Sequence, residues 1–220
     1  RNGPQPDIAY EHGPEKPSGT QSEGRSLVVC VDFKSAESFL AVKPTIKACK
    51  ERAIEIDWRI IKRPPLKKHA MPADTSNRGE MHRFFRSRYI ARDLARYAPV
   101  ELMNIYDEER SDWAYLGLLW LQEVGEKSTV IDNYIELVFQ KYWVEGRSID
   151  TSDSISEIFQ TMGFDAHEFL VYLEEDSGLA LSSRQEIDSE LPVMTTPTYF
   201  LSSEPYQGRQ HLPLIMSRLR

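Results

Sequence analysis

A buried strand that runs almost directly into a helix is the feature that most restricts the fold of this 220-residue chain. Residues Leu27–Val31 are apolar without polar alternation, which is typical of a strand buried on both faces. From Ala36 the apolar residues recur at helical spacing, and Ser35 is a residue type favoured at a helix N-cap. Free backbone N–H groups and the positive end of the helix dipole would then lie just beyond the strand. The junction therefore predicts a site for an anion or a thiolate.

The residues that follow extend this junction into a βαβ unit. We expect the strand to continue to Phe33 and the helix to run to about Arg52, with a kink or a break at Pro44. Apolar and polar residues alternate over Ile54–Ile60, which indicates a second strand with one more hydrophilic face. The crossover between two such parallel strands should be right-handed.

Helices are expected through the middle of the chain, and short strands near its end. After a loop over residues 62–79, the expected helices span residues 80–97, 111–124 and 129–144. Three segments have the pattern of capping boxes and two glycines that of helix stops: Thr129–Asp132, Ser154–Glu157, Asp165–Glu168, Gly163 and Gly178. The end of the chain predicts a strand from Pro197, a second strand over 206–209 and a helix from about His211.

The charge of the chain points to a small-molecule partner. A net charge of −7 and an isoelectric point near 5.4 argue against binding to nucleic acid or to a membrane surface, since both require a positive field. Arg88, Arg92 and Arg96 share one side of an expected helix, which we interpret as a solvated face. No apolar run is long enough to span a bilayer.

The cysteines and histidines form no recognisable metal or disulfide pattern. Cys30 lies in the first strand and Cys49 in the helix after it, which favours two reduced thiols and a cytoplasmic location. The five histidines show no pairing at helical spacing, so no metal site is expected. Residues 1–25 hold prolines and glycines among polar residues, which predicts a flexible N-terminal arm.

Two stretches of the sequence resemble a known family. Asp32–Ser35, followed by Ser38–Ala41, is similar to the opening motif of the 2-hydroxychromene-2-carboxylate isomerases and the kappa-class glutathione transferases, which are related to the DsbA-type oxidoreductases. The usual motif has proline after the serine, where this chain has Ala36. Tyr142–Asp150 also resembles the isomerase family, so the resemblance extends over roughly residues 27–220.

The resemblance implies both a fold and an activity. The fold is α/β and thioredoxin-like, with a DsbA-like domain over residues 26–220 and an inserted all-helical subdomain at about residues 80–185. The activity is that of a glutathione-dependent isomerase or transferase acting on a small electrophilic substrate. A homodimer would also be in keeping with this family.

Roles for individual residues follow from the same resemblance. In these families a serine faces the sulfur of bound glutathione, and Ser35 matches that serine. Thr196 and Pro197 match the cis-proline segment, whose backbone would bind glutathione as an added strand does. Gln210 stands where relatives have an acidic residue that holds the glutathione amine.

Two questions remain open from the sequence alone, and a third possibility is disfavoured. The basic residues Lys62 and Arg63 would line a site for an anionic ligand, or belong to a solvated loop. Ser35 would stabilise a glutathione thiolate, or only cap its helix in a catalytically inactive thioredoxin-fold module for binding or interaction. A disulfide oxidoreductase is disfavoured, because Ser35 and Ser38 occupy the positions of its two cysteines.

Overall fold

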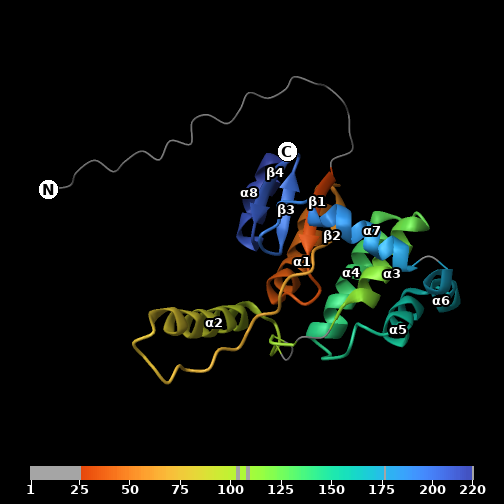
Figure 1. Cartoon of the computed structure of the whole chain (residues 1–220). Helices are drawn as coiled ribbons and strands as arrows, with labels where there is room; N and C mark the ends of the chain where they lie inside the picture. Colours follow the sequence, from red (N-terminus) through yellow and green to blue (C-terminus); the bar gives the residue numbers. More distant parts are fainter. Residues whose placement is uncertain (1–25, 103–104, 108–109, 176, 220) are drawn as a thin grey trace.

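A four-stranded sheet is combined with eight α-helices over residues 26–102, 105–107, 110–175 and 177–219, which this computed structural model describes. The flexible arm expected over residues 1–25 lies outside the described residues. Figure 1 shows the sheet near the chain's C-terminus, helices α3 to α7 gathered to one side of it, and α2 extending to the other side.

The sheet has the strand order β2-β1-β3-β4. Its strands are β1 (Ser26–Val31), β2 (Glu55–Ile60), β3 (Thr198–Leu201) and β4 (Glu204–Gln207). β1 pairs in parallel with β2 and antiparallel with β3, and β4 is antiparallel to β3. β1 is therefore an internal strand, as its unbroken apolar run predicts.

The helices fall into three groups along the chain. Helix α1 (Ala36–Lys50) connects the two parallel strands, and the short helices η1 (Arg209–His211) and α8 (Leu212–Arg218) follow the sheet. Six helices lie between β2 and β3: α2 (Arg78–Tyr97), α3 (Asp112–Glu123), α4 (Ser128–Trp143), α5 (Ser152–Met162), α6 (Ala166–Glu175) and α7 (Ser177–Ser189). This arrangement confirms the expected thioredoxin-like α/β fold with inserted helices.

Several local expectations were wrong in detail. The first strand ends at Val31 rather than Phe33, because the chain turns there toward α1. Helix α1 runs through Pro44 without a break, so the broken alternative is wrong. A proline removes one hydrogen bond from a helix, and the packing of α1 on the sheet and α4 retains the remaining turns.

Two of the expected capping boxes and one helix stop were also misplaced. Helix α4 begins after Lys127 without a side-chain cap, and Asp132 instead accepts a hydrogen bond of 2.7 Å from the Trp58 indole. Helix α5 is capped by Thr151, three residues before Ser154. Gly163 ends α5 in the left-handed conformation as expected, but Gly178 lies inside α7.

One apolar core joins the sheet to α1, α3, α4, α5, α6 and α8. From β1, Val29 and Val31 face this core, while the intervening Cys30 faces the opposite side of the sheet. There Cys30 packs in a small second cluster with Phe200 of β3 and Val193 from the segment after α7. β1 is thus buried on both faces.

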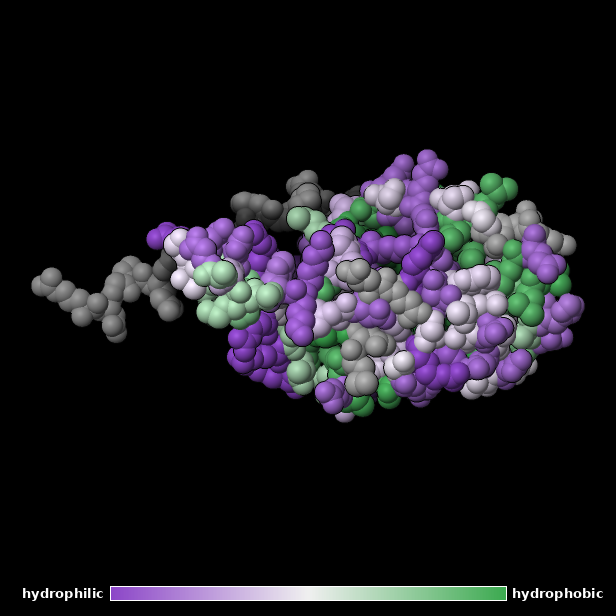
Figure 2. All heavy atoms as spheres, turned by 60° about the horizontal axis from the view of Figure 1, so that its bottom comes forward, coloured by the Kyte–Doolittle hydropathy of each residue, from purple (hydrophilic) through white to green (hydrophobic). Residues whose placement is uncertain are grey.

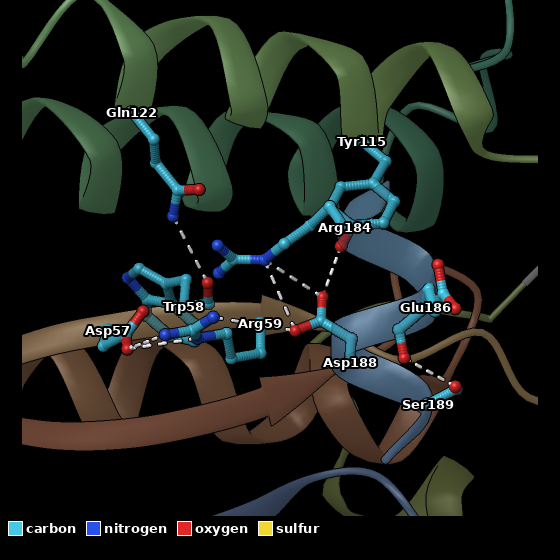
Figure 3. A network of polar contacts seen from close by, with 9 residues as sticks. All are labelled: Asp57, Trp58, Arg59, Tyr115, Gln122, Arg184, Glu186, Asp188 and Ser189. Atoms are coloured by element: carbon cyan, nitrogen blue, oxygen red, sulfur yellow. Dashed lines mark hydrogen bonds and ion pairs between the residues drawn. The ribbon is translucent and has the colours of Figure 1, made fainter. Parts of the chain in front are cut away.

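A polar network fastens α7 to the edge of the sheet (Figure 3). Asp188 of α7 is 2% exposed, accepts a hydrogen bond from the Tyr115 hydroxyl of α3, and forms ion pairs with Arg59 of β2 (3.7 Å) and Arg184 (3.4 Å). Burial and the Asp188 carboxylate together raise the pKa of Tyr115. Because a buried carboxylate without partners is strongly unfavourable, these contacts fix where α7 ends and the chain turns back toward β3.

One face of the molecule has a surface of mixed character. On the face shown in Figure 2, hydrophilic residues are interspersed with hydrophobic ones. In the part of the chain that the structure describes, no helix combines the length and the apolar character needed to cross a membrane.

Both cysteines are buried free thiols, as expected. Burial raises the pKa of Cys30 to about 12, with a contribution from Asp188, and burial likewise raises the pKa of Cys49 to about 12. We predict that iodoacetamide at mildly alkaline pH alkylates neither thiol in the native protein and both in the denatured protein, as counted by mass spectrometry. Rapid alkylation of the native protein would contradict the burial of these thiols.

Candidate functional site

Ser35 caps helix α1 and also contacts a distant part of the chain. Its Oγ accepts a hydrogen bond from the Ser38 N–H at 3.2 Å, while its backbone is extended at the N-cap. The same hydroxyl donates to the carbonyl oxygen of Thr196 at 3.3 Å, across 161 residues of sequence. The hydroxyl therefore bridges the helix N-terminus and the segment that leads into β3.

The segment before β3 contains a cis peptide bond between Thr196 and Pro197. Both residues are buried, and Gly208 after β4 donates its N–H to the Pro197 carbonyl at 2.8 Å. The Thr198 hydroxyl donates to the Thr195 carbonyl at 2.6 Å. These contacts hold the backbone of Thr196 beside Ser35.

A buried carboxylate organises the turn in front of Ser35. Asp32 is 2% exposed, and its two oxygens accept hydrogen bonds from the backbone N–H groups of Lys34 (2.9 Å) and Arg63 (2.7 Å). Burial raises the pKa of Asp32, and the two N–H groups oppose that rise. The Asp32 N–H in turn donates to the hydroxyl of the fully buried Ser38 at 3.2 Å, so Ser38 is held inside the protein.

Arg63 connects the end of β2 to the cis-proline segment. Its guanidinium donates to the carbonyl oxygens of Met194 at 2.7 Å and of Val193 at 3.5 Å. With the bond from its backbone to Asp32, Arg63 ties three separate parts of the chain together.

A cavity of about 570 Å³ opens beside Ser35. Its walls come from the N-terminus of α1, the loop after β2, helix α2 and the segment before the cis-proline. Part of the wall is apolar, with Leu66, Ile90, Leu94 and Ile105. The volume lies in the range of small-molecule sites.

The charged groups around this cavity are mostly cationic. Five lysine and arginine side chains line it, against two carboxylates: Lys34, Arg63, Lys67, Arg83 and Arg86, with Asp32 and Glu37. The N-terminus of α1 adds its own positive field at Ser35. An anionic ligand is therefore favoured in a protein that is acidic as a whole.

Some of the residues expected at the site lie elsewhere. The structure brings Ser35, Thr196 and Arg63 together at the cavity. Lys62 does not line it but pairs with Asp112 at the start of α3, because consecutive residues at the end of a strand point in opposite directions.

Gln210 also lies outside the cavity lining. It is exposed in η1, and its amide nitrogen donates to the Gln207 carbonyl at 3.2 Å.

Sequence reasoning missed the cavity residues supplied by α2. It singled out Arg88, Arg92 and Arg96, which are exposed and do not line the cavity, whereas Arg83 and Arg86, which are also exposed, do line it. The spacing of arginines within α2 gives no signal for this difference, because the packing of the helix decides which side meets the cavity.

The fold and site together define a class of protein. A βαβ unit with inserted helices, in which a cis-proline lies beside the N-terminus of the crossover helix, is a DsbA-type thioredoxin fold. The chain belongs to the family of the DSBA-like thioredoxin domain, whose family model matches residues 27–220. No curated protein matched the sequence significantly.

Solved structures share the fold at low sequence identity. A 2-hydroxychromene-2-carboxylate isomerase structure has a TM-score of 0.66 at 20% identity, covering 88% of this chain and 94% of its own. A structure of the cytosolic disulfide reductase DsbM from Pseudomonas aeruginosa with GSH has a TM-score of 0.57 at 13% identity, covering 89% of this chain and 99% of its own. A structure of a probable DsbA oxidoreductase from Streptomyces coelicolor has a TM-score of 0.61 at 14% identity, covering 88% of each chain. At such identities the likeness establishes the fold.

The cap itself can be tested by stability measurements. We predict that Ser35→Ala lowers the free energy of unfolding by about 1 kcal/mol, and Ser35→Gly by only a few tenths, because glycine is tolerated at an N-cap where alanine is not. Urea unfolding of the two variants and the parent protein measures both. Equal losses in the two variants would mean that the bond to Thr196, and not the cap, dominates.

Proposed function

We propose that this protein binds glutathione in the cavity beside Ser35 and acts as a glutathione-dependent isomerase or transferase on a small electrophilic substrate. The observation that carries the proposal is the Ser35 hydroxyl, placed at the N-terminus of α1 and against the carbonyl that precedes cis-Pro197. A hydroxyl and a helix N-terminus are both suited to stabilise a thiolate.

The Ser35 hydroxyl can turn its proton to a ligand without losing the helix cap. Its oxygen caps the helix by accepting from Ser38, so the cap does not use the proton. The proton is donated to the Thr196 carbonyl at 3.3 Å, a long bond for a hydroxyl donor. Turning that proton to a sulfur anion therefore costs one weak bond and keeps the cap.

The charge of the cavity suits the rest of the ligand. Glutathione carries two carboxylates, and the lining offers basic groups on separate elements: Arg63 after β2, and Arg83 and Arg86 on α2. Charge-assisted hydrogen bonds to such groups are the stronger kind.

The proposed reaction would use the sulfur of glutathione and the apolar wall of the cavity. When bound, glutathione would supply the nucleophilic sulfur for reversible addition to the substrate. The apolar residues Leu66, Ile90 and Leu94 offer an apolar substrate a surface within the same cavity. Two serines in place of two cysteines exclude disulfide exchange through Ser35 and Ser38.

Binding is the first test of this proposal. We predict that glutathione at about 100 times its Kd raises the free energy of unfolding by about 2.7 kcal/mol. Thermal unfolding with and without the peptide measures this, and a tripeptide with alanine in place of the cysteine serves as control and should give a smaller shift. No shift with either peptide would favour the catalytically inactive module.

The pKa of the bound thiol is the second test. We predict that Ser35→Ala raises the pKa of the glutathione thiol in the complex by about 1–2 pH units, because a hydrogen bond to a charged group is worth about 1.5–3 kcal/mol. The pH dependence of the ultraviolet absorbance of the thiolate measures it. Ser35→Gly is the matched control, since it removes the hydroxyl with little loss of stability. Identical titration curves in all three proteins would reduce Ser35 to a helix cap.

A further inference from the structure

The cavity contains one carboxylate whose oxygens are free to meet a ligand. Asp32 and Glu37 are the two acidic residues of the described chain that line it. Both oxygens of Asp32 already accept backbone hydrogen bonds, from Lys34 and Arg63, and its side chain is buried. Asp32 is therefore satisfied by the protein, and Glu37 is left.

Glu37 lies in the first turn of α1, two residues after Ser35. It is partly buried, and within the described residues its carboxylate has no hydrogen-bond or ion-pair partner at contact distance. Burial raises the pKa of Glu37; Arg209 opposes that rise, and Asp93 adds to it. Arg209 itself packs over the Tyr97 ring, with 4.3 Å between the guanidinium carbon and the ring centroid.

A half-buried carboxylate without a direct partner gains most from a cationic group brought by a ligand. Loss of hydration has already been incurred in the folded protein, so a charged hydrogen bond there is stronger than one in water. The lysines and arginines of the lining are Lys34, just before Ser35, and four residues from other elements, the loop after β2 and helix α2: Arg63, Lys67, Arg83 and Arg86. Among the described residues, the cavity thus offers one unpaired carboxylate, two residues after Ser35, together with basic groups from other elements, so a zwitterion would find a partner for each of its charges.

We propose that Glu37 binds the α-ammonium group of a γ-glutamyl thiol peptide whose sulfur lies at Ser35. This inference rests on the proposed function and specifies it further: Glu37 is a specificity residue that selects thiols carrying a free amine several bonds from the sulfur. Gln210, which is exposed and outside the cavity lining, has no part in this contact.

The test compares two ligands on three proteins. The ligands are glutathione and its deamino analogue, N-glutaryl-cysteinylglycine, which keeps the thiol and both carboxylates but lacks the ammonium. The proteins are the parent chain, Glu37→Gln and Glu51→Gln, the last being a matched control at the other end of α1. Isothermal titration calorimetry gives the Kd of each pair.

We expect Glu37→Gln to lose affinity for glutathione, which carries the ammonium, and not for the deamino analogue. In the parent protein and in Glu51→Gln, glutathione should bind about tenfold or more tightly than the deamino analogue. In Glu37→Gln the two ligands should bind with similar affinity, because only the ammonium contact has been removed. A variant that was merely unstable would weaken both ligands equally.

Two results would overturn the inference, and they are distinguishable. If the parent protein binds glutathione and Glu37→Gln still prefers it over the deamino analogue, Glu37 does not hold the ammonium while the proposed function stands. If the parent protein binds neither peptide, the proposed function fails and the role of Glu37 fails with it.

Discussion

The buried carboxylate of Asp32 is the group on which the site depends. Its bond to Lys34 fixes the turn from β1 to α1, and its bond to Arg63 fixes the first residues after β2. The Arg63 guanidinium then holds the carbonyls of Val193 and Met194, just before the cis-proline. Removal of the Asp32 carboxylate would leave the N–H groups of Lys34 and Arg63 without their acceptor, which is costly inside a protein. Asp32 thus positions two segments directly and, through Arg63, the segment before the cis-proline. A second tie, from the Trp143 indole to the Phe33 carbonyl at 2.9 Å, anchors the same turn to α4.

Within this frame, Ser35 serves structure and chemistry at once. A hydroxyl accepts and donates independently, so the helix cap occupies a lone pair and leaves the proton for Thr196 or for a ligand. Capping and thiolate binding are therefore compatible roles for one residue. Ser38 differs in this respect, because it is fully buried and its oxygen is already used by the Asp32 N–H.

Parts of the fold that rest on local patterns were predictable. The unbroken apolar run of β1 predicted an internal strand, and Ser35 was correctly identified as the cap of α1. Local patterns failed where a distant partner competed for the same group. The spacing of Thr129 and Asp132 matched a capping box, yet Asp132 accepts its hydrogen bond from Trp58 of β2. Gly178 fitted a helix stop but lies in the first turn of α7, a position at which glycine is also tolerated.

The sequence by itself determined the strand-to-helix junction, its cap and the free state of both cysteines, since each depends on residues close together in the chain. Only the tertiary structure decided which side chains surround the junction. Arg63 lines the cavity while Lys62 pairs with Asp112, and Arg83 and Arg86 line the cavity while the other arginines of α2 do not: Arg78, Arg88, Arg92 and Arg96. Those choices follow from how α2 and the loop before it pack against α1, and packing between elements far apart in sequence leaves no trace in the periodicity of either one.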